Sequence, residues 1–313
     1  RFVSVRPSMP RIKPSVPMVL EEGVEMRNRS RMYCTGFLFF CGLWAGCGPT
    51  AKIESTEITL LRSPVLPRDP TDPQWEKMPS FTAKLLLQDL VEPRLLDPST
   101  AAVSVKGVTN GVDMMFRLQW ADSTMDDRSA IEAFSDACAI QFLNEQANDL
   151  PAPQMGEDGR SVEITYWNAC WQAIVNGRGD SLRALYPNSA IDHYPFQTRA
   201  LAPGSAEKQQ MAMRYAPARA LGNDMGGPRQ QPVQDLVAEG PGSLRPASLR
   251  LSQGTGSRSA EGWMVVISRP LTASLKKGGR SHIALAIWDG HRREVGARKM
   301  RTGWIPTLIK EGL

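Results

Sequence analysis

Short apolar runs separated by turn residues predict a chain built mainly of β-strands. The two clearest runs, 101–108 and 113–120, flank Asn110-Gly111, a dipeptide typical of a tight hairpin turn. Within 113–120, apolar residues recur at every second position, which is the period of a strand with one buried face. Further strands are predicted at 58–62, 81–87, 134–142, 161–167, 263–269, 282–288 and 298–304.

Helices are expected to be few and short. The sequence predicts one at 168–175, and 211–221 is either a helix or an extended connection. The stretch 176–210 is irregular, and 222–259 is rich in Gly, Pro, Ser and Arg, which is typical of a surface loop. The expected fold class is therefore mainly β, an antiparallel β-sandwich with a few short helices and long loops.

The first 46 residues have the pattern of an export segment. Arg27, Arg29 and Arg31 precede an uncharged apolar run, 32–46, which is too short to span a bilayer comfortably. The run ends Leu-Trp-Ala-Gly-Cys, which resembles a bacterial lipoprotein signal with Cys47 as the lipid-bearing residue. We therefore expect residues 1–46 to be an upstream extension plus export signal, with Met26 as the true start. Residues 47–313 would form one exported, periplasmic domain, either free or anchored through Cys47.

The basic net charge changes meaning once it is located along the chain. The whole chain carries +5 and has a pI near 9.0, which would suit a nucleic-acid partner. Residues 1–25 hold a net +1 and residues 26–46 a net +3, so that only +1 remains on 47–313. We therefore expect no nucleic-acid binding by the exported domain.

Cysteine and histidine spacing excludes several metal sites. No C-x-x-C occurs, which excludes a zinc knuckle and covalent haem attachment. The histidines, His193, His282 and His291, have no H-x-H or H-E-x-x-H spacing. Cys138 and Cys170 either pair in an oxidising compartment or stay buried as free thiols, and the sequence leaves both alternatives open.

Several strings, taken in order, are similar to one known family. They are FRLQWAD at 116–122, DACAIQF at 136–142, Met155-Gly156, VEITYWNACWQ at 162–172, GWMVVISRPL at 262–271 and AIWDG at 286–290. Their order and spacing resemble the haem b-binding gamma subunit of the type II dimethyl-sulfoxide-reductase family. Its relatives include gamma subunits of ethylbenzene, dimethyl-sulfide, selenate, chlorate and nitrite oxidoreductases. The resemblance spans about 58–304, and the stretch 222–259 resembles the nitrite-oxidising branch most.

The resemblance implies a β-sandwich that holds one non-covalent haem b. Its iron would be held by a Met from the loop after the D-A-x-A-x-Q-F strand and by a Lys near the C-terminus. These positions correspond to Met155 and Lys299. His291, directly after W-D-G, is the alternative second ligand, and Lys276 and Lys277 are a further one, although they adjoin an expected hairpin turn at Gly278-Gly279. The chain departs from the family pattern at Thr165, usually aromatic, and at Cys170, often acidic.

Two protein ligands leave haem iron no open position, so such a site carries electrons and does not activate oxygen. A lysine binds iron only as the neutral amine, whereas its ordinary pKa is about 10.4. Burial and metal binding both favour loss of that proton. The site therefore requires an apolar pocket around the lysine.

The resemblance also implies partners and a role. The chain would be a non-catalytic electron-transfer subunit, linking the iron–sulfur beta subunit of a molybdopterin alpha-subunit enzyme to an external cytochrome. The alternative is a haem-free, lipid-anchored β-sandwich that binds carbohydrate through exposed aromatics. The sequence contains no nucleophile–base motif that would support a stand-alone hydrolase.

Three further groups of residues have two interpretations each. Arg117 and Arg269 reach haem propionates or form cross-strand ion pairs. The spacing of Asp122, Asp126 and Asp127 in one turn could suggest a calcium site, but a solvated loop or helix cap is the favoured interpretation. The tryptophans are expected in the core and pocket walls, at positions 120, 167, 171, 263, 288 and 304.

Overall fold

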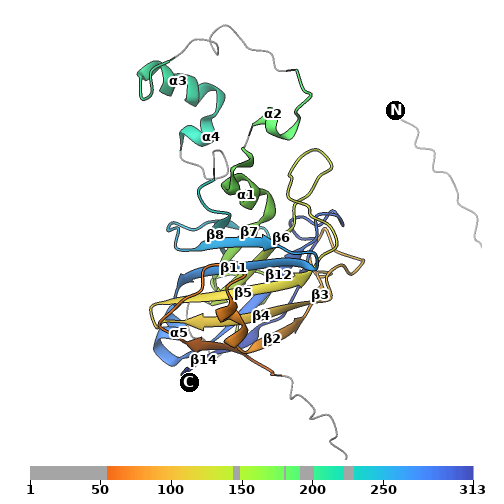
Figure 1. Ribbon diagram of the computed structural model, residues 1–313, viewed down its shortest axis with the longest axis vertical. Helices are drawn as coiled ribbons and strands as arrows, with labels where there is room; N and C mark the ends of the chain where they lie inside the picture. The colour runs from red at the N-terminus through yellow and green to blue at the C-terminus, as the bar shows by residue number, and fades with distance from the viewer. Residues whose placement is uncertain (1–54, 144–148, 180, 191–200, 222–228, 313) are drawn as a thin grey trace, which may run out of the picture. The chain divides into compact units, whose positions relative to one another are not determined.

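The computed structural model describes residues 55–143, 149–179, 181–190, 201–221 and 229–312. In this part of the chain fourteen strands form one mixed sheet, in the order β10-β11-β5-β4-β1-β14-β12-β6-β7-β8-β9, with β2, β3 and β13 attached at its sides (Figure 1). The strands are β1 (Ile58–Arg62), β2 (Ser80–Lys84), β3 (Leu86–Leu87), β4 (Ala102–Thr109), β5 (Asp113–Ala121), β6 (Ala137–Leu143), β7 (Val162–Asn168), β8 (Val233–Ala238), β9 (Arg245–Pro246), β10 (Gln253–Arg258), β11 (Gly262–Pro270), β12 (Arg280–Trp288), β13 (Met300–Arg301) and β14 (Ile305–Lys310).

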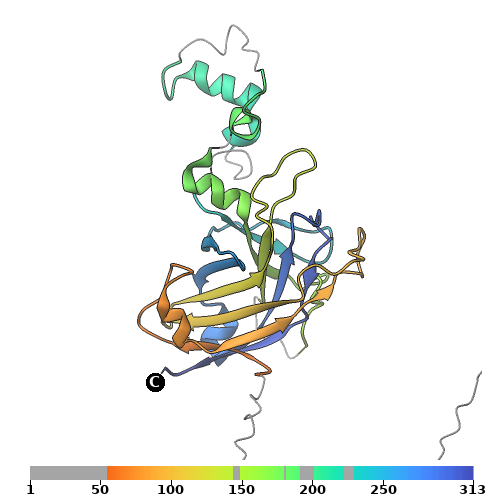
Figure 2. The ribbon, with the colours of Figure 1, turned by 45° about the vertical axis from the view of Figure 1, so that its right-hand side comes forward.

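The helices are all short. They are the 3₁₀ turn η1 (Pro73–Lys77), α1 (Ala169–Ala173), the π turn η2 (Ile174–Arg178), α2 (Leu182–Leu185), α3 (Ala206–Tyr215), α4 (Pro217–Ala220) and α5 (Ala273–Gly278). Figure 2 shows α1 continuing directly from the end of β7. Among the described helices, none combines the length and apolar character that crossing a bilayer requires.

The sheet folds over on itself, so that the β11-β5-β4 half faces the β12-β6-β7 half across the main hydrophobic core (Figure 2). Phe116 of β5 meets Phe142 of β6 at 6.1 Å between ring centroids. Trp167 of β7 packs edge-on against Trp120 at 6.3 Å and against Trp263 at 5.1 Å. The prediction of a mainly β, two-layered fold is confirmed.

One pairing differs from the antiparallel pattern predicted from the sequence. β1 lies between β4 and β14 and runs parallel to both, which makes the sheet mixed and joins the two halves. The chain reaches β4 from β1 only after η1 and β2, and such a crossover permits parallel pairing where a tight hairpin would not. The sequence around β1 does not reveal which strands it meets.

The hairpin predicted around Asn110-Gly111 is present between β4 and β5. Asn110 Oδ1 accepts hydrogen bonds from the N–H groups of Val112, at 2.9 Å, and Asp113, at 2.8 Å. Gly111 has φ 91°, in the left-handed region that favours glycine. The predicted strand bounds agree with β4 and β5 to within one residue.

Three sequence predictions in the second half of the chain are wrong. The supposed loop 222–259 contains β8, β9 and β10, and α3 begins at Ala206 within the supposed irregular stretch. The glycines of β10 look like turn residues in the sequence, but they lie against neighbouring side chains. A Cβ on Gly256 would stand 2.3 Å from Cζ2 of Trp167. The expected hairpin turn at 276–279 is instead part of α5, which crosses from β11 in one half to β12 in the other.

Both described cysteines, Cys138 and Cys170, are buried free thiols. Their pairing, one of the two alternatives left open by the sequence, is therefore wrong. The predicted export segment 1–46, the candidate lipid site Cys47 and His193 lie outside the described residues.

Candidate functional site

A second apolar cluster, which we call the outer-face cluster, lies on the face of β6, β7, β8 and β12 that points away from the main core. Side chains alternate along β6, with Cys138, Ile140 and Phe142 in the main core and Ala137 and Ala139 in the outer-face cluster. Every residue of β6 is buried, so both faces of this strand are covered. The cluster consists of Ala137, Ala139, Val162, Ile164, Ala238, Ala286 and Trp288, with Met155, Tyr166, Leu236 and Trp304 packed against it.

Met155 reaches this cluster from a loop that three hydrogen bonds hold over the sheet. Trp304 Nε1 donates to the Pro151 carbonyl at 2.6 Å, and Gln141 Nε2 donates to the Pro153 carbonyl at 3.3 Å. The Gly240 N–H donates to the Met155 carbonyl at 2.8 Å. Met155 itself has φ 71°, a left-handed conformation that costs a non-glycine residue roughly 1 kcal/mol or more. The loop therefore holds the Met155 side chain in a defined position, at the cost of strain in the Met155 backbone.

Lys299 reaches the same cluster from a segment near the C-terminus. The Gln88 N–H donates to the Lys299 carbonyl at 3.1 Å, and Gln88 Nε2 donates to the Ala297 carbonyl at 3.0 Å. Beyond Lys299 the chain enters β13, where Met300 pairs with Ile287 and Arg301 with Ala286. This register places Lys299 beside Trp288, and its Nζ lies 5.0 Å from the Trp288 ring centroid.

The electrostatic surroundings of Lys299 disfavour its charged form. Burial lowers the pKa of Lys299 to about 8, and the neighbouring charge of Arg301 acts in the same direction. No hydrogen bond or ion pair joins Nζ to another described residue, and Nζ lies over the Trp288 ring. A lysine in this setting gives up its proton far more easily than a solvated one, as coordination of a metal by the amine requires.

The structure therefore brings Met155 and Lys299 to one cluster, as the family resemblance implies for a ligand pair. Two small side chains lie between the larger ones of this cluster, because Ala139 of β6 pairs directly with Ala286 of β12. We call this pair the alanine floor. Sequence reasoning missed these alanines and also Gln88 and Gln141, which fix the two ligand-bearing segments. The alternation of alanines in D-A-C-A was the available signal, but small residues at alternate strand positions are common.

The alternative ligands lie elsewhere. His291 is exposed and lines a polar cleft with Asp122, Thr124, Asp289 and Arg292. Lys276 and Lys277 are exposed in the last turn of α5. All three side chains are exposed, unlike the partly buried Lys299.

Arg117 and Arg269 both form ion pairs, as one of their two interpretations stated. Arg117 Nη2 lies 3.0 Å from Glu76 Oε1 of η1, on the outer face of β5. Arg269 of β11 pairs with Glu163 of β7, across the two halves of the sheet, and its guanidinium lies 4.5 Å from the Phe142 ring centroid. The pairing with Glu76 is not cross-strand, because η1 rather than a strand carries the acid.

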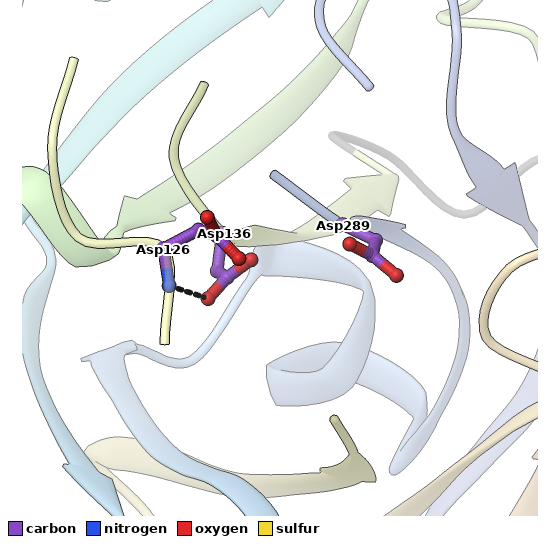
Figure 3. Close-up of side chains that lie close together, drawn as sticks. All are labelled: Asp126, Asp136 and Asp289. Carbon is purple, nitrogen blue, oxygen red and sulfur yellow. Dashed lines mark hydrogen bonds between the residues drawn. The ribbon is translucent and has the colours of Figure 1, made fainter. Parts of the chain in front are cut away.

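Three carboxylates gather where the β5–β6 loop meets the end of β12 (Figure 3). One oxygen each from Asp126, Asp136 and Asp289 lies within 4.8 Å of the others. Asp136 is fully buried and accepts hydrogen bonds at 2.9 Å from three donors, the N–H groups of Asp126 and Gly290 and Nε1 of Trp263. Burial raises the pKa of Asp136 to about 7 and outweighs these donors. Through these hydrogen bonds Asp136 connects β11 in one half of the sheet with the end of β12 in the other.

The turn proposed from the sequence as a calcium site is divided among different roles. Of its three acids only Asp126 belongs to the carboxylate group. Asp127 pairs with Arg178 at 3.0 Å, and Asp122 Oδ1 accepts the Thr124 N–H at 2.9 Å. Burial raises the pKa of Asp122. Asp122 therefore stabilises the loop itself, whereas Asp127 joins the loop to η2. Neither acid is the fully solvated side chain that the sequence favoured.

Comparison with known proteins bears on the identity of this site. Residues 72–300 match the profile of the ethylbenzene dehydrogenase family. The dimethylsulfide dehydrogenase gamma subunit of Rhodovulum sulfidophilum is 30% identical over 137 residues, which are 41% of this chain and 49% of that subunit. The chain thus spans about half the length of this relative.

Two solved structures also match, both of a family 9 carbohydrate-binding module from Caldicellulosiruptor kristjanssonii. The complex with cellotriose has a TM-score of 0.38 at 8% identity, covering 82% of this chain and 94% of the module. The complex with glucose has a TM-score of 0.37 at 9% identity, covering 82% and 96%. Matches this distant have no bearing on the site.

The match over 72–300 includes all the strands that form the outer-face cluster, together with Met155 and Lys299. This match and the similarity to the dimethylsulfide dehydrogenase gamma subunit identify a gamma-type subunit of the type II dimethyl-sulfoxide-reductase family, and the resemblance found in the sequence is confirmed. The chain belongs to the ethylbenzene dehydrogenase family.

Proposed function

We propose that the chain is an electron-transfer subunit that carries one non-covalent haem b, with Met155 and Lys299 as the axial ligands of its iron. The observation that carries this proposal is that both side chains reach the same outer-face cluster, Met155 by packing against it and Lys299 through the Trp288 ring. They come from segments far apart in the sequence, each held by its own hydrogen bonds. An apolar face with a thioether and an easily deprotonated amine has the donor set that bis-ligated haem requires.

Haem b supplies a one-electron couple between ferrous and ferric iron when it is bound. The residues of the chain would set the reduction potential of that couple. The Met155 thioether is a soft ligand that favours the ferrous state. The burial that lowers the pKa of Lys299 keeps water from the same face. The small side chains of Ala139 and Ala286, paired across β6 and β12, leave more room for a macrocycle than larger ones would.

The partners proposed here follow from the family. The relative from Rhodovulum is named as a gamma subunit of a dehydrogenase. By analogy, this chain joins an iron–sulfur beta subunit and a molybdopterin alpha subunit, and passes electrons to or from an external cytochrome. Substrate chemistry belongs to the alpha subunit. The apolar run 32–46 supports export to the periplasm, with a lipid at Cys47 as an additional anchor.

The carbohydrate-binding alternative finds no supporting observation in the described residues. It requires an exposed aromatic platform, yet the tryptophans of the sheet are buried or partly buried. The exposed large aromatics of the described chain are Tyr186, just after α2, and Tyr215 of α3, neither of them on a strand.

The visible spectrum of the purified chain tests the proposal. The oxidised protein should show a Soret band, and reduction should produce the sharp alpha band of a six-coordinate b-type haem. Met155→Ala and Lys299→Ala should each alter that band. Lys299→Arg should do the same, because a guanidinium stays protonated and cannot bind iron.

Matched controls use exposed residues of the same type. Met125→Ala and Lys276→Ala should leave the spectrum unchanged, since both side chains are exposed and lie outside the outer-face cluster. A wild-type chain without a reduced alpha band would refute haem binding. A band unaffected by the loss of Met155 or of Lys299 would remove that residue from the ligand pair.

A further inference from the structure

The inference concerns Arg301, which lies two residues beyond the proposed ligand Lys299 and on the same face of the sheet. In β13, Met300 is buried in the main core, so Arg301 points to the opposite face. Its partner across the ladder is Ala286, a member of the outer-face cluster. Two residues along an extended chain are roughly 6.6 Å apart, which places the Lys299 and Arg301 side chains next to each other at the cluster.

Arg301 is a half-buried arginine beside the outer-face cluster. Its Nε is buried without a hydrogen bond, and no ion pair joins its guanidinium to any described residue. Arg178 and Arg269 also have a buried, unpaired Nε, but the rest of each guanidinium forms an ion pair, with Asp127 and Glu163. Arg298, which precedes Lys299, has the same unpaired Nε as Arg301. A buried guanidinium nitrogen without an acceptor costs free energy unless a ligand supplies one.

The charges around Arg301 support the same conclusion. Lys299 and Arg301 lie on one face of the sheet, and Lys299 Nζ approaches the Trp288 ring instead of a carboxylate. No carboxylate of the described chain pairs with either of them. The unpaired Arg301 guanidinium beside an apolar cluster therefore presents a site for an anion with an apolar body.

We propose that the Arg301 guanidinium binds a propionate carboxylate of the haem. This inference rests on the proposed function, because Lys299 would hold the iron while Arg301 reaches the rim of the same macrocycle. Arg301 is then a positioning residue that fixes the rotation of the haem in its plane. A guanidinium suits this role because it presents a planar pair of donors to a carboxylate.

The test compares two probes on the haem-free full chain, ferric haem b and its dimethyl ester, in which both propionates are esterified and uncharged. Soret absorbance gives the dissociation constant of each. We expect the wild type to bind haem b more tightly than the ester. Arg301→Gln should weaken haem b binding by roughly ten- to hundredfold and leave ester binding nearly unchanged. Arg301→Lys, which keeps the charge but not the planar pair of donors, should fall between the two.

Arg280→Gln is the matched control, because Arg280 is an exposed arginine at the start of β12 and should leave both constants unchanged. The reduction potential is a second measurement: Arg301→Gln should lower it, since loss of a nearby positive charge favours ferric iron. Equal weakening of both probes by Arg301→Gln, or equal wild-type affinity for the two, would overturn the inference. A wild type that binds neither probe would instead refute the proposed function.

Discussion

At the scale of single residues, Met155 shows how the chain accepts strain at its proposed site. Its φ of 71° favours glycine, yet the position holds a methionine. We expect Met155→Gly to be more stable than Met155→Ala by about 1 kcal/mol, because glycine adopts this conformation without a steric penalty. Urea unfolding of the two haem-free variants measures the difference, and both should lose the native haem spectrum. Equal stabilities would mean that the backbone at 155 is not strained.

Asp136 gives a second residue-scale prediction, on pH dependence. Its pKa is about 7 in the folded chain and about 3.9 when unfolded, so between these values the folded state binds more protons. Stability from this group is therefore full below pH 4 and is lost as the pH rises to 7. The stability of the wild type minus that of Asp136→Asn should fall over this range, by at most roughly 1.4 kcal/mol per pH unit.

Denaturant unfolding from pH 4.5 to 7.5 measures this difference. Asp136→Asn should also be destabilised across the range. Both carboxylate oxygens of Asp136 accept hydrogen bonds, and the asparagine NH2 group would replace one of these acceptors with a donor. A difference that grows with pH would show that the three donors stabilise the carboxylate by more than its burial costs.

At the scale of elements, the facing strands β6 and β12 decide whether the outer-face cluster is a packed core or a surface prepared for a ligand. Ala286→Leu adds three carbons at the floor, beside Ala139. If haem covers this floor, the variant should bind haem at least tenfold more weakly, while the haem-free chain keeps its stability or gains some. If the floor is already fully packed, overpacking should destabilise the haem-free chain by about 1–3 kcal/mol. Soret titration and urea unfolding separate the two outcomes.

Elements whose signal is local could be predicted from the sequence. Asn110-Gly111 predicts the β4–β5 hairpin, and an apolar run within each strand predicts β6 and β7. β10 could not be predicted, because its glycines are explained only by Trp167, a residue distant in the sequence. The parallel pairing of β1 is likewise set by contacts across the whole chain.

The candidate site divides in the same way. Family resemblance pointed to Met155 and Lys299, since their motifs are readable as strings. The alanine floor and the unpaired Arg301 emerge only when β12 and β13 are placed side by side.

At the scale of the whole molecule, we call the residues between η2 and β8 the insertion, and its helices α2 and α3 contribute little to the core. Neither α2 nor α3 contains a buried residue. Both ends of the insertion are held near α1, because Arg178 Nη2 donates to the Cys170 carbonyl at 3.3 Å and Arg229 stacks on Trp171 at 3.5 Å. A short linker should therefore be able to replace residues 182–221.

We expect a variant with a short Gly-Ser linker in place of 182–221 to keep its free energy of unfolding within about 1 kcal/mol, because shortening a surface loop changes its closure entropy only slightly. Its reduced haem spectrum should match that of the full chain. Leu236→Asp is the contrasting variant, since it leaves the insertion intact but places a carboxylate against the outer-face cluster, and it should lose haem affinity. Urea unfolding and Soret titration test both variants. Loss of the haem spectrum on replacing the insertion would show that this segment covers the haem, and that the outer-face cluster alone does not make the site.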